Sequence, residues 1–92
     1  MSPPPVPLQA LLLHERALGS GGALLGIWLW RDARGLRYRL DCERGGRSLV
    51  RYDNETPRGH LRTLAGRAAP YAFRSVEQLR YDFERDMRAA LA

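Results

Sequence analysis

Alternating apolar and polar residues predict a run of β-strands in the first half of the chain. The clearest is residues 36–42, whose apolar face consists of Leu36, Tyr38, Leu40 and Cys42. Residues 24–31 are rich in branched and aromatic side chains, and residues 47–53 again alternate, so we expect strands there as well. Residues 8–17 alternate too, although they also fit a helical face, and we choose a strand because hairpins follow.

The connections between these strands predict their register. Residues 33–35 and 44–46 each end in glycine, which suits a three-residue hairpin loop whose last residue is left-handed. The predicted pairs are Trp30 with Tyr38, Trp28 with Leu40, Leu40 with Val50 and Tyr38 with Tyr52. All of these side chains are apolar or aromatic and would share a core face. A two-residue loop at Gly45-Gly46 would instead place Leu40 opposite Arg51 and mix the faces.

The opposite face of the same strands is predicted to be basic. It would collect Arg37, Arg39, Arg51 and Asp53, with Arg37 opposite Asp53. An arginine cluster with one carboxylate suits a phosphate. A solvated face with weak cross-strand ion pairs is an equally good interpretation. Ile27 and Leu29 would also point to this side, so we expect a homodimer or a partner protein to cover them.

The second half of the chain predicts a helix. Ser75-Val76-Glu77-Gln78 has the form of a capping box, and the apolar residues that follow recur at helical spacing. These residues are Val76, Leu79, Phe83, Met87 and Leu91. Before the helix, residues 60–64 could form a short edge strand. Tyr71 and Phe73 are expected to pack the loop that precedes the helix against the core.

Together these elements predict an α+β fold: a four-stranded antiparallel meander with one C-terminal helix packed on one face. That helix would cover the face that carries Trp28, Trp30 and Tyr38. Residues 8–92 would form a single domain, and the proline-rich residues 1–7 would be a disordered tail.

Composition adds a preference for an acidic partner. All 15 basic residues are arginine, and the formal net charge is +5 with an isoelectric point near 10.3. Arginine binds phosphate and carboxylate with a planar fork, which favours RNA, DNA or an acidic protein. A GC-rich genome would give the same arginine usage without any function, so charge alone does not decide.

Other features exclude whole classes of protein. Cys42 is the single cysteine, which rules out an intrachain disulfide and a cysteine-built zinc site, and we expect it to be buried. No basic segment precedes the first apolar run, and that run is broken by His14-Glu15-Arg16. We therefore expect no signal peptide and no membrane span, and a cytoplasmic protein.

The acid–base chemistry of the chain lies between residues 51 and 62. His60 is the strongest candidate for proton transfer, because an unperturbed imidazole titrates near neutrality. A plain surface histidine is the alternative, and His14, among leucines, is expected to be structural. Asp53, Glu55 and His60 could hold magnesium loosely, but their spacing is not diagnostic. We predict no metal and no cofactor.

Several segments together resemble the TumE family of toxin–antitoxin proteins. They are Leu11-Leu12-Leu13-His14-Glu15-Arg16, Arg51-Tyr52-Asp53-Asn54-Glu55, Gly59-His60-Leu61-Arg62, Gly66-Arg67, Pro70-Tyr71-Ala72-Phe73 and the amphipathic end from Ser75. The resemblance covers nearly all of the chain after residue 8, and the R-Y-D-N segment is its most specific part. One departure is clear: where the family typically has Asp-His-Arg-His, this chain has His60-Leu61-Arg62-Thr63, so only Arg62 matches directly.

The resemblance implies a small bacterial toxin encoded beside a helix-turn-helix antitoxin, and toxins of this size usually act on RNA or translation. The leading hypothesis is a metal-independent ribonuclease. Arg51 and Arg62 would hold the scissile phosphate, His60 would be the general acid or base, and Asp53 would orient a neighbouring arginine. Contacts to nucleic acid would come from Arg37, Arg39, Arg51, Arg62 and Arg67.

Two alternatives remain open at this stage. The replaced histidines fit either a weakened or inactive member or one in which His60 has taken over the role. The rival function is a non-catalytic binding protein that docks on a helix-turn-helix antitoxin, a regulator or nucleic acid through the basic sheet face.

Overall fold

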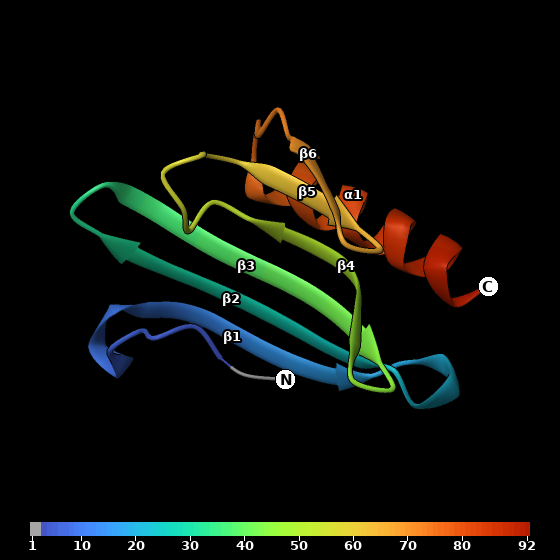
Figure 1. Ribbon diagram of the computed structural model, residues 1–92. Helices are drawn as coiled ribbons and strands as arrows, with labels where there is room; N and C mark the ends of the chain where they lie inside the picture. The colour runs from blue at the N-terminus through green and yellow to red at the C-terminus, as the bar shows by residue number, and fades with distance from the viewer. Residues whose placement is uncertain (1–2) are drawn as a thin grey trace.

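The computed structural model describes residues 3–92 as one antiparallel sheet with a C-terminal helix against it (Figure 1). Its strands follow one another in chain order: β1 (Leu11–Leu18), β2 (Leu24–Asp32), β3 (Gly35–Arg44), β4 (Arg47–Asp53), β5 (Leu61–Leu64) and β6 (Arg67–Pro70). The helix α1 spans Val76–Leu91, and short 3-10 turns η1 and η2 occupy Leu8–Ala10 and Ser20–Gly22. The α+β meander is confirmed, with six strands in place of four because β5 and β6 extend it. The predicted first strand begins at Leu11, after η1.

Helix α1 begins and packs as its sequence predicts. The Ser75 hydroxyl accepts a hydrogen bond from the Gln78 backbone N–H at 3.1 Å, which satisfies one of the donors that a helix N-terminus leaves free. The Gln78 side chain donates to Asp82. Leu79 and Phe83 are buried against the sheet, so the apolar stripe is confirmed.

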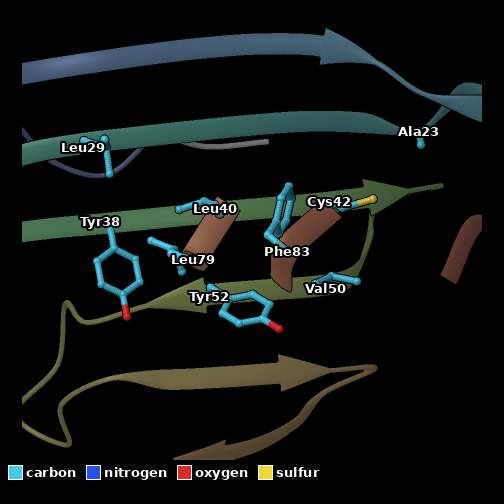
Figure 2. Packing of buried hydrophobic residues seen from close by; sticks show 9 residues of the cluster. All are labelled: Ala23, Leu29, Tyr38, Leu40, Cys42, Val50, Tyr52, Leu79 and Phe83. Atoms are coloured by element: carbon cyan, nitrogen blue, oxygen red, sulfur yellow. The ribbon is translucent and has the colours of Figure 1, made fainter. Parts of the chain in front are cut away.

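The core lies between α1 and the middle of the sheet. Figure 2 shows Tyr38, Leu40 and Cys42 on β3 and Val50 and Tyr52 on β4, with Leu79 and Phe83 reaching them from the helix. The predicted common face of β3 and β4 is therefore confirmed, and Cys42 is fully buried. Burial raises the pKa of the Cys42 thiol.

The predicted register of β2 against β3 is wrong by one residue. Ala33 and Arg34 form a two-residue turn, because the Asp32 carboxylate accepts a hydrogen bond from the Arg34 N–H at 2.7 Å and Asp32 then pairs with Gly35. This slip turns every side chain of β2 to the other face.

The slip moves the tryptophans away from the helix. Leu29 pairs with Tyr38 and Ile27 pairs with Leu40 on the core face, whereas Trp28 and Trp30 lie on the opposite face. The prediction that α1 covers both tryptophans is wrong. Ile27 and Leu29 pack into the core, so they do not form the apolar patch from which a homodimer was expected.

The register of β3 against β4 differs by two residues, which preserves the faces. Gly45 and Gly46, both at positive φ, form a two-residue turn, and a β-bulge beside Cys42 adds a further shift. Leu40 therefore pairs with Tyr52, and neither with Val50 nor with Arg51. On the other face the pairs are Arg39 with Asp53 and Asp41 with Arg51, in place of Arg37 with Asp53.

The tryptophans are buried without the helix. His14 stacks on Trp28 with ring centroids 5.1 Å apart, and η1 contacts β2 near the same end of the sheet. Pro4 is buried, although it belongs to the segment predicted to be a tail. We call the surface that carries Trp28, Arg39, Arg51 and Asp53 the far face, and the surface under α1 the helix face.

Candidate functional site

The sheet divides the predicted site residues between its two faces. Across β4 and β5, Tyr52 pairs with Arg62 and Arg51 pairs with Thr63. Neighbours along a strand point to opposite faces, so Arg51 lies on the far face and Arg62 on the helix face, beside Tyr52. One phosphate cannot lie between Arg51 and Arg62.

Three arginines of the far face each hold a carboxylate. Arg39 binds Glu55 through two hydrogen bonds of 2.6 and 2.7 Å. Arg51 pairs with the buried Asp41 at 2.9 Å, and Arg37 pairs with Asp32 at 3.1 Å. Much of the positive charge on this face is therefore offset by its own acids.

Asp53 is the least satisfied group of the far face. The residue is 7% exposed, and among residues 3–92 its Oδ1 and the Nε of Arg51 have no hydrogen-bond partner. Burial, followed by the charge of Glu55, raises the pKa of Asp53 above its usual value. Asp53 is thus a carboxylate kept from water without full compensation.

Asn54, the last residue of the R-Y-D-N segment, fastens the ends of β3 and β4. Its side-chain oxygen accepts from the Tyr38 N–H and its side-chain nitrogen donates to the Leu36 carbonyl, both at 2.9 Å. The amide side chain continues the hydrogen-bonding pattern of the sheet where the strand ends. This residue has a structural role.

His60 lies at the edge of the helix face. Its Nδ1 is 2.8 Å from the Tyr38 hydroxyl oxygen, and its ring stacks on Phe73 with centroids 5.2 Å apart. Tyr71 packs edge-on against Tyr52 at 4.9 Å. The contacts of Phe73 and Tyr71 hold the segment before α1 against the core and fix the orientation of the imidazole.

Arg62 lies on the helix face of β5, where it meets α1. Its Nε and Nη2 donate to the two carboxylate oxygens of Asp86 at 2.7 and 2.9 Å, and Nε also donates to the Tyr52 hydroxyl oxygen at 3.0 Å. The Tyr52 hydroxyl itself donates to Asp86. A guanidinium held by a bidentate ion pair has a fixed position.

The pKa values of this cluster favour the charged ion pair. Burial alone would raise the pKa of Asp86, but hydrogen bonds from Arg62 and Tyr52 outweigh it, and the pKa lies below its usual value. The hydrogen bond to Asp86 raises the pKa of Arg62. Burial and the bond to Asp86 raise the pKa of Tyr52 to about 12, so the phenol keeps its proton at neutral pH.

An open groove extends from this cluster toward the start of α1. We call it the α1–β5 groove; it is a cavity of about 360 Å³, and its polar lining includes Tyr52, Arg62, Tyr71, Arg74, Asp82 and Arg85. The Tyr71 hydroxyl donates to Asp82 at 2.6 Å. Three arginines around one hollow suit an anionic ligand.

Sequence reasoning named Arg62 but missed the acids that hold it. Asp82 and Asp86 lie four residues apart beside the apolar stripe of α1, and both are buried. That spacing was the available signal, since acids bordering a buried stripe can face the sheet. Arg67, also predicted to contact nucleic acid, is exposed on β6, away from these contacts.

Two other features of the described chain bear on function. Residues 3–92 contain no group of three metal-binding side chains, and Asp53 and His60 lie on different faces of the sheet. Over the same residues, no helix is both long and apolar enough to cross a bilayer.

Comparison with known proteins identifies the family. Neither the curated proteins nor the solved structures gave a match. The family model of the toxin TumE matches residues 16–91, which include every strand from β2 onward and the helix. The match covers the groove, Arg62 and both buried acids of α1. The chain belongs to the TumE toxin family, and it is therefore the toxin of a toxin–antitoxin pair with a cognate antitoxin.

Proposed function

We propose that this toxin acts on RNA as a metal-independent ribonuclease whose site is the α1–β5 groove and the adjoining His60. The observation that carries the proposal is the fixed guanidinium of Arg62 on the same side of the sheet as His60. Two residues along a strand are about 6.6 Å apart. In the proposed complex, one phosphodiester would contact both the imidazole and the guanidinium.

Arg62 would bind the phosphate and stabilise its developing negative charge. Asp86 occupies Nε and one donor of Nη2, so the remaining guanidinium N–H groups are available to a ligand. Arg85 lines the same groove and adds a second positive charge near the phosphate. Because Asp86 and Tyr52 hold Arg62 in place beforehand, little reorganisation accompanies binding.

His60 would move the proton. When Nδ1 carries hydrogen it donates to Tyr38, and Nε2 can then accept the proton of a ribose 2′-hydroxyl. The 2′-oxygen attacks the adjacent phosphorus, the bond to the 5′-oxygen breaks, and that oxygen takes a proton from water in the open groove. The products are a 2′,3′-cyclic phosphate and a free 5′-hydroxyl. In the other tautomer, Nε2–H would serve as the proton donor to the leaving oxygen.

Of the four predicted catalytic residues, this proposal uses His60 and Arg62. Arg51 and Asp53 lie on the far face, where Arg51 holds Asp41, and they cannot contact the same phosphate as Arg62. For the antitoxin, we propose a helix-turn-helix protein encoded beside this gene, as the family resemblance implies. The rival function, a non-catalytic binder that uses the basic face, is less favoured because the buried carboxylate of Asp53 lies beside Arg39 and Arg51 and disfavours an anion there.

The two histidines give a matched test. Overexpression of the wild-type chain should stop growth, and the purified protein should cleave RNA in the presence of EDTA. His60→Ala should lower the cleavage rate by roughly 10²–10⁴-fold, the usual contribution of a general acid or base. His14→Ala, which removes the far-face histidine, should cleave as the wild type does. A wild-type protein that binds its antitoxin but cleaves no RNA would contradict the enzyme and support the binding module.

A further inference from the structure

The outer surface of α1 carries an exposed aromatic residue next to the groove. Tyr81 is 57% exposed, although a large aromatic side chain in a small domain is usually packed. Helical spacing places it on one strip with Gln78, Arg85 and Arg88. Gln78 and Arg85 also line the α1–β5 groove, so this strip is continuous with the groove. We call it the Tyr81 strip.

The charges around the Tyr81 strip leave it basic on the side of the groove. Arg85 lies near Asp82 and Asp86, at 3.3 and 3.5 Å, and is half exposed. Asp82 and Asp86 offset two of the three arginines that line the groove, Arg62, Arg74 and Arg85, and one positive charge is left in excess.

Arg88 adds positive charge to the Tyr81 strip, and the remaining charges of α1 lie beside the strip, away from the groove. Arg88 is exposed one turn beyond Arg85. By helical spacing, Glu77 and Glu84 lie on the side of Tyr81 away from the groove. Arg80 is paired with Glu15 on β1 at 2.7 Å, on that same side of the helix. Positive charge therefore faces the groove and acidic residues border the strip.

An exposed aromatic ring between arginines suits single-stranded nucleic acid. Aromatic side chains stack on any unpaired base, while arginines follow the phosphates. A duplex would not offer a base to Tyr81, because its bases are already stacked on one another. An acidic protein surface would use the arginines but would gain little from the ring.

We propose that RNA bound at the α1–β5 groove continues as a single strand over α1, with one base stacked on Tyr81 and its phosphates beside Arg85 and Arg88. The inference rests on the proposed function for the location of the cleaved bond. It adds a specificity: the toxin requires unpaired nucleotides flanking the site of cleavage. Tyr81 and Arg88 are binding residues and take no part in the proton transfer.

Binding of a short fluorescein-labelled single-stranded RNA of mixed sequence, followed by anisotropy, tests the Tyr81 strip. Tyr81→Ala should weaken binding roughly 5- to 150-fold, the effect of losing one base–aromatic stack, whereas Tyr81→Phe should bind as the wild type does. Arg88→Ala should lower the slope of log affinity against log salt by about 0.7, one phosphate contact to a single strand. The same RNA in duplex form should bind equally to the wild type and to Tyr81→Ala. Leu18→Ala and Arg31→Ala, exposed residues outside the strip, are the controls.

The outcomes separate this inference from the proposed function. If Arg62→Ala abolishes RNA binding while Tyr81→Ala and Arg88→Ala bind as the wild type does, the strip is wrong and the groove stands. If the wild type binds no RNA at all, both proposals fail. If Tyr81→Ala keeps its RNA affinity and loses its affinity for the antitoxin, the strip is a protein-binding surface and the RNA path is overturned.

Discussion

Asp53 and Asp86 are both buried aspartates, at 7% and 8% exposure, yet they lie on opposite faces of the sheet and their pKa values move in opposite directions. Asp86 has two hydrogen bonds from Arg62 and one from Tyr52, which more than offset its burial. Asp53 has an oxygen without a partner within the described chain and the negative Glu55 nearby. Burial is common to both, so the partners decide which carboxylate is stably charged.

This difference supports the proposal that the ligand binds on the helix face. On the helix face Asp86 holds Arg62 by two hydrogen bonds, and Arg62 lines an open groove. On the far face the arginines are distributed over separate carboxylates, and the remaining buried acid disfavours an anion nearby. Ion pairs occur on both faces, and on the helix face a fixed cation, Arg62, adjoins an open groove.

The largest change in the free energy of unfolding should come from loss of packing under α1. Phe83→Ala should lower the free energy of unfolding by about 3–5 kcal/mol, because it leaves a cavity between α1 and the sheet. Leu18→Ala, at an exposed position of β1, should change it by no more than about 0.5 kcal/mol. Urea unfolding measures both, and equal losses would mean that α1 is not the element that buries the core.

The next effect in size concerns the charged partner of Arg62. Asp86→Asn should lower the free energy of unfolding at neutral pH by about 1.5–3 kcal/mol, the worth of hydrogen bonds to a charged group. The pKa of Asp86 is lowered in the folded state, so its contribution is present above the unfolded value, about 3.9, and is lost as the pH falls through the folded value. The difference between variant and wild type should therefore shrink in acid. A deficit that persists unchanged at low pH would show that packing, and not charge, is responsible.

The smallest effect should have the opposite sign. Asp53→Asn should raise the free energy of unfolding at neutral pH by about 1 kcal/mol, the lower range for a buried unsatisfied group. The pKa of Asp53 is raised in the folded state, so folding favours its protonated form, and this benefit is lost as the pH rises through the folded value. The gain of the variant should vanish below about pH 3.9, where both states of the wild type are protonated. A loss of stability at pH 7 would reveal a partner for Asp53 and remove the contrast between the faces.

Local sequence patterns predicted the helix well and the sheet register less well. The cap at Ser75 and the stripe through Phe83 depend on residues within one element, so spacing was sufficient. The register depended on the Asp32 turn and on the bulge beside Cys42, and a bulge has no periodic signal in the chain. The one-residue error in the length of the Asp32 turn placed the tryptophans on the wrong face in the prediction.

The candidate site was predictable only in part for a similar reason. Arg62 and His60 stood out by residue type, but which of their neighbours they meet depends on contacts distant in sequence. Asp86 lies 24 residues from Arg62. Its position in the helix alone predicts a solvent-facing acid, and its burial depends on the contact between α1 and β5. Arg51, adjacent to Tyr52 in the most specific segment, lies on the other face because neighbours alternate along a strand.

RNA cleavage by two matched arginine variants tests most directly the claim that the site is on the helix face. Arg62→Gln and Arg51→Gln each replace a strand arginine that pairs with a buried aspartate, and thermal unfolding would confirm that both proteins are folded during the assay. Arg62→Gln should lower the cleavage rate by roughly 10²–10³-fold, the effect of removing an electrostatic donor to the phosphate, and should relieve growth arrest. Arg51→Gln should cleave within a few-fold of the wild type. Loss of cleavage in folded Arg51→Gln, with cleavage retained in Arg62→Gln, would place the site on the far face and contradict the account.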